Sequence, residues 1–445
     1  MKKSMLKSSL GLRLAIITFL SLLLLIPVQM IKSLIKERQE RREEAVNEVF
    51  SKWGKEQVIG GPILTIPYQG KMKTADGEII EVKKWIHLLP ENLLINGSVM
   101  PEPRYRGIYE MVLYQADIQI TGYFKSSELV NMNISQERIL WNEASLSLGI
   151  SDMKGIKEMV AVKWDEKVYP FGPGVLTKNV LPSGIGVRIP FHPDQDKYQF
   201  DLALRVCGSE NLQFTPVGKE TKVSISSIWN NPSFTGEFLP DSREIQEDGF
   251  KAEWKVLYMN RNYPQKWIGD EYTIEPSTFG VSFLIPVDEY QKTMRTVKYA
   301  LMFIAFTFLT VFLIELLDGK AVHPIQYLLI GFALLIFYSL LLALSEHLRF
   351  NFAYLVAVLA TISLISGYTS AVLKSNRQAF LIFGFLFILY SYLYLVLQLQ
   401  DYALLMGSLI LFVILAVVMF LTRRIDWFSI LKQADTAQLN EPSTG

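Results

Sequence analysis

The chain has 445 residues, 44 of them basic and 43 acidic, yet half of its residues are hydrophobic and its mean hydropathy is +0.24. This composition excludes a disordered chain, because disordered segments combine low hydrophobicity with high charge. The net charge of +1 gives no support for a nucleic-acid partner, since such proteins usually carry a strong basic excess. The single cysteine, Cys207, excludes an internal disulfide and any motif that needs two cysteines.

Charged and apolar residues are segregated along the chain. Residues 297–424 contain only 11 of the 87 charged residues, although they make up more than a quarter of the length. Positive hydropathy and high charge therefore belong to different segments, which predicts a membrane part and an aqueous part.

The first apolar run, residues 14–31, follows an N-terminal segment (residues 1–13) with four basic residues and no acidic one. A cleavable signal peptide would need small residues at a cleavage site, but this run leads into Pro27 and Val28. Its length is close to what a helix needs to cross a bilayer. We predict that it is a signal anchor and the first transmembrane helix.

Five further apolar segments lie within residues 297–422, and each is long enough to span a membrane. They are Tyr299–Leu317, Ile325–Leu344, Phe352–Leu373, Ala379–Leu397 and Tyr402–Leu421. The sequence thus predicts an α-helical bundle of six transmembrane helices. Small residues recur three or four positions apart in the Phe352–Leu373 segment, which favours this helix as the packed centre of the bundle.

Six spans place both termini on one side of the membrane. The positive-inside rule makes that side cytoplasmic, including the tail of residues 423–445. The basic residues that agree are Lys2, Lys3, Lys7, Lys320, Lys374, Arg377, Arg423 and Arg424. Five basic residues between Lys32 and Arg42 conflict with this orientation. Because long domains are translocated largely regardless of charge, we keep both termini cytoplasmic.

Residues 32–296 form one large insert between the first and second helices. Val46, Val49, Phe50 and Trp53 recur at helical spacing, which predicts that the first helix continues into the insert. Beyond residues 60–62 the apolar period becomes two, as in the alternating positions 200–206 and 250–258. The pattern predicts a large all-β, sandwich-like extracytoplasmic domain of antiparallel strands, or two such units.

Three predicted strands carry glycine five residues before an isoleucine-proline pair. The pairs are Ile66-Pro67, Ile189-Pro190 and Ile285-Pro286. Proline cannot donate to a sheet ladder, so the recurrence favours ordinary strand ends. An internal duplication is the alternative.

The chain contains no familiar catalytic, nucleotide-binding or metal-binding motif. His87 lies in a strand-like run and His192 precedes a proline, so both are interpreted as structural or solvated. Cys207 falls on the polar phase of a strand and is interpreted as a bystander. We therefore expect no enzyme activity, no catalytic or metal-binding residues and no cofactor.

The ionisable residues of the membrane part are better candidates for function, because such groups are costly there. Glu315 ends the second predicted helix, His323 and Pro324 open the third, and Glu346 and His347 close it. Pro324 suits a first helical turn, which His323 could cap. About 36 Å of helix separates His323 from His347, so these residues are expected at opposite faces of the membrane. Helix caps and interface anchors are favoured over a proton relay.

The segment 231–240 supplies the candidates in the insert. Phe234 and Phe238 lie in a stretch with proline and glycine, which favours packing at a corner between strands. A partner surface is the alternative, because loops on rigid sheets often carry binding.

Several of these segments resemble the CreD family of bacterial inner-membrane proteins, also called cell-envelope integrity proteins. The residues that carry the resemblance are Gly61-Pro62-Ile63-Leu64-Thr65-Ile66-Pro67, Asn231-Pro232-Ser233-Phe234-Thr235-Gly236-Glu237-Phe238-Leu239-Pro240, Gly249-Phe250 with Trp254, His323-Pro324-Ile325-Gln326-Tyr327-Leu328-Leu329, Leu341-Leu342-Ala343-Leu344-Ser345-Glu346-His347 and Leu421-Thr422-Arg423. The resemblance implies an inner-membrane protein with a large periplasmic domain, linked to envelope stress and regulated with a two-component system. It implies no catalytic residue.

Together these features predict a protein that supports cell-envelope integrity or the envelope-stress response, with a periplasmic β domain that binds an envelope lipid or protein. A transporter or lipid-handling protein that uses the helix bundle is the main alternative. A periplasmic hydrolase is a weaker one, since it would need His192 to meet Asp194 or Asp241 in one pocket.

Overall fold

The computed structural model describes residues 10–73, 78–130, 132, 134–178, 180–283, 289–318, 322–399 and 403–423. The chain divides into a helical unit, Met1–Arg41 with Val287–Gly445, and a sheet unit, Arg42–Pro286. Most of the predicted N-terminal segment, Lys320 and the tail from residue 424 lie outside the described residues.

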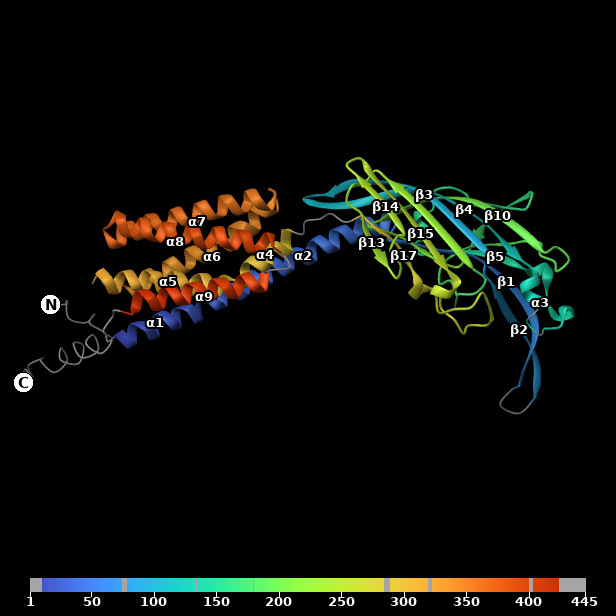
Figure 1. Cartoon of the computed structure of the whole chain (residues 1–445), viewed down its shortest axis with the longest axis horizontal. Coiled ribbons are helices and arrows are strands. Elements are labelled where there is room, and N and C mark those ends of the chain that lie inside the picture. Colours follow the sequence, from blue (N-terminus) through green and yellow to red (C-terminus); the bar gives the residue numbers. More distant parts are fainter. Residues whose placement is uncertain are drawn as a thin grey trace, which may run out of the picture. The chain divides into compact units, whose positions relative to one another are not determined.

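The helices follow the apolar segments closely (Figure 1). They are α1 (Leu10–Leu23), α2 (Leu25–Trp53), α4 (Glu289–Lys298), α5 (Ala300–Asp318), α6 (Pro324–Ser345), α7 (Phe350–Leu373), α8 (Asn376–Gln398) and α9 (Ala403–Thr422). Four helical stretches are long and apolar enough to cross a membrane, and a fifth results if α4 and α5, bent by 44°, form one span. The apolar stretch of α9, Leu405–Val417, is shorter, so the six predicted spans are matched only in part.

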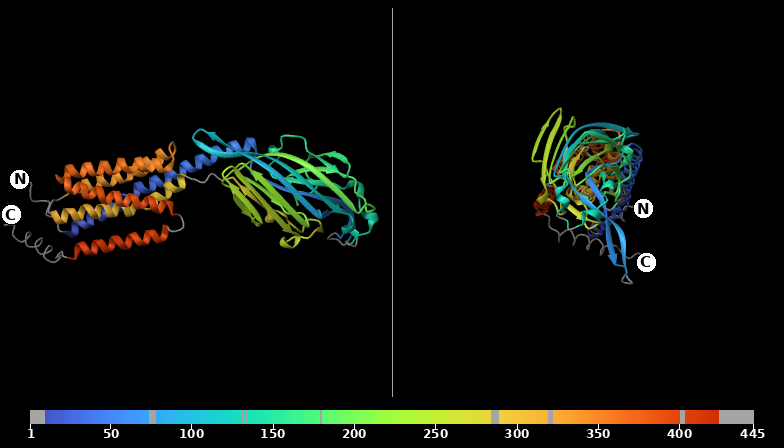
Figure 2. Two further views of the ribbon diagram at one scale, coloured as in Figure 1. Left: turned by 45° about the horizontal axis from the view of Figure 1, so that its top comes forward. Right: turned by 90° about the vertical axis from the view of Figure 1, so that its right-hand side faces the viewer.

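Helix α6 lies at the centre of the helical unit. It packs against α1, α4, α5 and α7, and α7 packs in turn against α8 (Figures 1 and 2). The prediction that α7 would be the packed centre is wrong: Ala353 and Ala357 are buried, but Ala360, Ser363 and Gly367 of the same small-residue series are exposed. Only part of the small-residue series in α7 therefore lies at contacts with other described helices.

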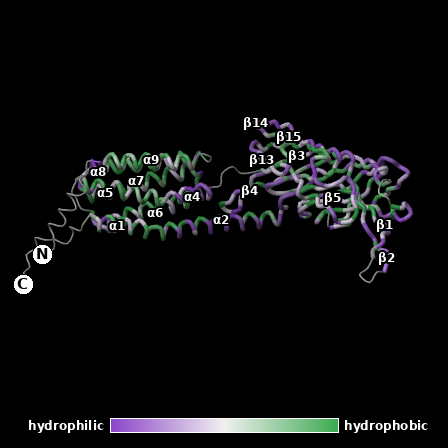
Figure 3. Tube along the Cα trace, turned by 60° about the horizontal axis from the view of Figure 1, so that its bottom comes forward, coloured by the Kyte–Doolittle hydropathy of each residue, from purple (hydrophilic) through white to green (hydrophobic). Residues whose placement is uncertain are grey.

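The helices of this unit consist largely of hydrophobic residues, as Figure 3 shows by the hydropathy along the chain trace, and many of these residues are exposed. Phe380 and Ile388 of α8 and Phe412 of α9 each have about 70% of their surface exposed. Large exposed apolar surfaces of this kind are typical of helices that face lipid.

The sheet unit contains two large sheets. The first contains β1 (Gln57–Lys73), β2 (Ile79–Leu88), β5 (Ser145–Ile150), β8 (Gly172–Pro173), β9 (Gly184–Arg188), β11 (Asn211–Thr215), β13 (Ser233–Gly236), β16 (Lys266–Ile268) and β17 (Phe279–Ser282). The second contains β3 (Asn92–Arg106), β4 (Tyr109–Lys125), β6 (Ala161–Trp164), β7 (Lys167–Pro170), β10 (Lys197–Ser209), β12 (Glu220–Ser227), β14 (Ser242–Gln246) and β15 (Gly249–Leu257). A short helix, α3 (Ser127–Val130), also belongs to this unit.

Strand pairing differs from the prediction in one respect. The prediction had only antiparallel strands, but β1 pairs with β11 in parallel and β3 pairs with β12 in parallel. The other named pairs are antiparallel, with the long hairpin of β3 and β4 in register from Asn92 opposite Tyr123 to Arg106 opposite Tyr109. The unit is therefore a domain of mixed sheets. The prediction missed the parallel pairs because a local sequence pattern does not show which distant strands pair.

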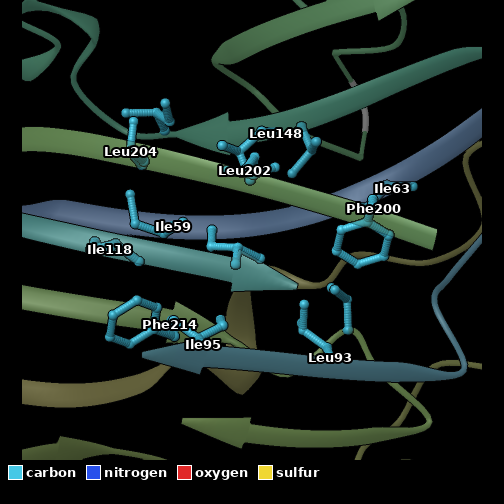
Figure 4. Close-up of a cluster of buried hydrophobic side chains, with 14 of the residues drawn as sticks. Ile59, Ile63, Leu93, Ile95, Ile118, Leu148, Phe200, Leu202, Leu204 and Phe214 are labelled. Atoms are coloured by element: carbon cyan, nitrogen blue, oxygen red, sulfur yellow. The ribbon is translucent and has the colours of Figure 1, made fainter. Parts of the chain in front are cut away.

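Both sheets contribute side chains to one hydrophobic core. Ile59 and Leu148 come from the first sheet, and Ile118 and Leu202 from the second, and Figure 4 shows side chains of both sheets gathered between the strands. Burying a side chain of this size contributes about 1.5–3 kcal/mol relative to leaving it exposed. The alternating positions predicted from sequence are the ones that fill this core, as along β10 and β15.

The second half of α2 belongs to the sheet unit, as its helical spacing predicts. Phe50 is buried together with Met111 and Leu113 of β4, and Val49 and Trp53 pack against this cluster. The strand-end prediction fails at Pro67, because β1 continues to Lys73, whereas β9 does end just before its isoleucine-proline pair. The third pair lies outside the described residues.

Candidate functional site

The start of α6 is built by His323 and Pro324. Pro324 occupies the first turn, where its missing N–H costs nothing. The Nδ1 atom of His323 accepts from the Ile325 N–H at 3.3 Å, and the His323 N–H donates to the Gln326 side chain at 2.8 Å. These bonds satisfy backbone groups that a helix start leaves unpaired, so the predicted cap is confirmed.

Glu315 lies in a network beside this cap. Its carboxylate accepts from the Arg13 guanidinium of α1 at 2.6 Å and from the Tyr327 hydroxyl of α6 at 2.8 Å. The Glu315 side chain is only 5% exposed, so its charge depends on these partners for compensation. The network joins α1, α5 and α6 at one end of the helical unit.

Glu346 has a second network at the other end of α6. Its carboxylate accepts from the Tyr290 hydroxyl of α4 at 3.1 Å and lies 3.9 Å from the Arg38 Nε of α2. The side chain is 11% exposed. His347, which follows it, is exposed. Each end of α6 thus has a glutamate that meets an arginine and a tyrosine from other helices.

Tyr327 of the first network and Glu346 of the second lie 19 positions apart, which is about 28 Å along α6 at 1.5 Å per residue. The two networks therefore form two sites, and no direct contact joins them. The sequence analysis did not identify Arg13, Arg38 and Tyr290 as partners of the two glutamates. One signal was available for Arg13, since it interrupts an apolar helix and so needs a counter-charge.

A cluster of aromatic side chains is buried inside the helical unit. The Phe337 ring lies 4.7 Å from the Tyr390 ring and 5.7 Å from the Tyr354 ring, measured between centroids. Phe303 packs on Tyr390 at 4.9 Å, and the Tyr354 hydroxyl donates to the Tyr390 carbonyl at 2.7 Å. All four residues are buried, so they form a packed aromatic cluster among α5, α6, α7 and α8.

In the sheet unit, Phe234 and Phe238 contact the core. Phe234 of β13 meets the rings of Phe250 and Trp254 edge-on at 5.8 and 5.7 Å. Phe238 meets Phe279 edge-on at 5.8 Å, and its carbonyl accepts from the Trp254 indole at 3.3 Å. These contacts favour packing, the first of the two interpretations.

His87 and Cys207 are both buried. The Nδ1 atom of His87 lies 3.0 Å from the Thr65 hydroxyl, and burial lowers the pKa of His87 to about 4. Cys207 follows the polar phase of β10, as predicted, but it is only 2% exposed because the end of this strand is buried on both faces, and burial raises the pKa of its thiol. A buried thiol with a raised pKa is a poor nucleophile.

The geometry offers no metal centre in the described ranges: three or more His, Cys, Asp or Glu side chains nowhere converge there as a metal ion would need. A solved M1 zinc metallopeptidase from Deinococcus radiodurans shares 10% identity over 38% of this chain and 39% of its own, with a TM-score of 0.18. That value is too low to indicate a common fold.

Two comparisons cover nearly the whole chain. The family model described as inner membrane protein CreD matches residues 9–428. The inner membrane protein CreD of Escherichia coli (strain K12) is 33% identical over 434 residues, which is 96% of this chain and 95% of the relative. The match includes both helical networks and the sheet unit, and the chain therefore belongs to the CreD family of inner membrane proteins.

Proposed function

We propose that this inner-membrane protein supports the integrity of the bacterial cell envelope without catalysing a reaction. The sheet unit binds an envelope lipid or protein, and the helical unit anchors it. Membership of a family of inner-membrane proteins supports a location in the inner membrane. The large sheet unit supports a binding role, because rigid sheets present loops that recognise partners.

The observation that carries this proposal is the way the helical unit uses its buried carboxylates. Glu315 and Glu346 are engaged by arginine and tyrosine at the two ends of α6, and aromatic rings pack between them. A transport path needs polar groups near mid-depth, and a catalytic carboxylate needs access to a substrate. Neither condition is met at these glutamates, so a structural anchor fits them best.

We further propose six membrane spans, with α9 as the last, both termini cytoplasmic and the sheet unit periplasmic between the first two spans. Lys374 at the end of α7 and Arg377 in the first turn of α8 support this orientation by the positive-inside rule. The basic residues after the first span conflict with this orientation, and their glutamate partners do not cancel them, because acidic residues contribute little to the rule. Long domains, however, are translocated largely regardless of charge.

Dye exclusion tests the envelope role. Cells that lack the chain are expected to take up more 1-N-phenylnaphthylamine than wild-type cells, and the full chain should restore exclusion. Unchanged uptake in the deletion strain, also under envelope stress, would refute the role. The absence of catalysis is tested separately: turnover of an envelope lipid or peptidoglycan precursor by the purified protein, lost in Glu346→Ala or His347→Ala, would overturn it.

One observation favours lipid handling as a second function. An open groove of about 680 Å³ runs between α2 and α6, lined by Pro27, Met30, Leu34, Phe332 and Ile336 among others. Its apolar walls suit an acyl chain. The lipid-handling function predicts that Ile336→Trp, which fills the groove, reduces capture of a photoactivatable phospholipid, while Leu359→Trp on the exposed face of α7 does not. Equal capture by both variants would exclude this function.

A further inference from the structure

The sheet unit contains a second cavity that the proposed function has not used. Its volume is about 500 Å³, within the range of small-molecule sites. Four short chain segments line it, residues 237–238, 260–263, 271–273 and 276–277. The first of these belongs to the stretch that the sequence analysis identified as a possible partner surface.

Arg261 is the buried cation of this cavity. The residue is only 7% exposed, and its guanidinium stacks 4.4 Å from the centre of the Tyr263 ring. Its Nη2 atom donates to the Gln265 side chain, which is itself held by a hydrogen bond to the Pro90 carbonyl at 2.6 Å. The guanidinium is therefore fixed in place before any ligand arrives.

Most of the donors of Arg261 are unused. Its Nε and Nη1 atoms are buried and have no hydrogen-bond partner in the part of the chain that the structure describes. No carboxylate of the described residues lies within 4.0 Å of the guanidinium. A buried arginine without a counter-charge is costly, because desolvation of a cation is repaid only by a close anion. The site is thus short of one anionic group.

Two carboxylates line the same cavity nearer to solvent. Glu237 and Glu271 are both exposed, whereas Arg261 is buried. Phe238 and Tyr263 add aromatic surface to the lining, and Asn260, Asn262 and Thr273 add polar groups. The cavity is therefore lined by a buried cation, by aromatic and polar side chains, and by two exposed carboxylates.

We propose that this cavity binds a small zwitterion whose singly charged anionic group meets Arg261 and whose ammonium group lies between Glu237 and Glu271. A dianionic phosphate monoester is disfavoured, because one guanidinium cannot balance it and the two carboxylates repel it. Two kinds of ligand have this chemistry. A free amino acid or short peptide carries an ammonium group and a carboxylate, and a phosphoethanolamine headgroup carries an ammonium group and a phosphodiester. The proposal extends the proposed function by giving the sheet unit a ligand site.

Calorimetric titration of the purified full chain in detergent tests the site. The probes are alanyl-alanine, N-acetyl-alanyl-alanine, alanyl-alanine amide and glycerophosphoethanolamine. We expect saturable binding of at least one of the two zwitterions, and the one that binds identifies the anionic group. For a dipeptide site, the amide should lose binding and the acetylated form should bind more weakly.

Arg261→Gln is expected to raise the dissociation constant at least about tenfold, as loss of a charge-assisted hydrogen bond does. Because Arg261 is buried, its substitution also perturbs folding, so the exposed Glu237→Gln/Glu271→Gln double variant provides an independent test. It should weaken the zwitterion but not the acetylated peptide. Arg243→Gln on exposed β14, outside the cavity, is the matched control and should bind as wild type does.

The proposal is overturned if neither zwitterion binds saturably, or if binding is the same in wild type, the Arg261 variant and the double variant. Binding is measured on purified protein and dye exclusion in cells. A negative binding result would therefore not refute the envelope role, and a negative dye-exclusion result would not refute the ligand site.

Discussion

Arg13 and Glu315 lie 302 positions apart in the chain, yet the Arg13 guanidinium is 2.6 Å from the Glu315 carboxylate. The contact fixes α1 against α5, and the Tyr327 hydroxyl extends it to α6. The N-terminal helix α1 is thereby joined to the consecutive helices α5 and α6 at one end of the helical unit. Because the Glu315 carboxylate is buried, breaking this contact tests how much the network stabilises the helical unit.

Arg13→Gln should lower the free energy of unfolding of the helical unit by about 2–3 kcal/mol, because the buried Glu315 loses its cation while Arg13 itself is partly exposed. Thermal unfolding of the full chain in detergent measures this. The matched control is Arg41→Gln, whose pair with Glu37 is exposed and should change stability by no more than about 0.5 kcal/mol. Equal effects of the two substitutions would contradict the structural role of the network.

Stability should also depend on pH through His87. In the folded protein its pKa is about 4, below the ordinary value of 6.5, because burial disfavours the charged form. Above pH 6.5 the residue is neutral in both states. As the pH falls from 6.5 to 4, the unfolded chain gains a proton that the folded chain does not bind, so folding is destabilised by up to about 3 kcal/mol.

Chemical denaturation of wild type and His87→Gln between pH 7 and 4.5 measures this effect. The difference in stability between the two proteins should shift in favour of the variant as the pH falls. His192→Gln, at an exposed position, should keep the wild-type pH dependence. A pH dependence unchanged by His87→Gln would show that another group is responsible.

Phe234→Ala and Phe238→Ala should each destabilise the sheet unit by about 2 kcal/mol, since both rings are half-buried against core aromatics. Denaturation followed by tryptophan fluorescence reports the change. Leu239→Ala, at a side chain that is 71% exposed, is the control and should cost less than about 0.5 kcal/mol. If both phenylalanine variants were as stable as this control, the partner-surface interpretation would replace packing.

The proposed orientation can be tested with single cysteines in a Cys207→Ser background. In intact spheroplasts, Arg243→Cys in the sheet unit should react with a membrane-impermeant maleimide. Asn376→Cys, at the first residue of α8, should react only after lysis. Both positions are exposed, so access to the reagent decides the result. The opposite pattern would invert the orientation.

Much of the architecture could be predicted from the sequence, because its causes are local. Apolar length gave the positions of α6, α7 and α8, and alternation gave the buried faces of β10 and β15. The cap formed by His323 and Pro324 was equally predictable, because capping residues act on the next turn of the same helix.

Pairing across long sequence distances was not predictable. Nothing near β1 indicates that it joins β11 in parallel, and nothing near Glu315 indicates Arg13. Arg261 was missed for a related reason. Its burial and its unused donors arise from packing by Tyr263 and Gln265, whereas in the sequence it looks like an ordinary surface arginine. The burial of Cys207 was not predictable either, because β10 is covered on both faces only at its end.

The central claim is that the sheet unit binds an envelope component, and in-cell photocrosslinking from Leu239 tests it most directly. A benzophenone amino acid at this exposed position, beside the cavity residue Phe238, should capture an envelope lipid or an extracytoplasmic protein that mass spectrometry identifies. The same probe at Leu359 on α7 should not capture that species. Capture of cytoplasmic proteins alone, or of nothing beyond what the Leu359 probe captures, would contradict the account.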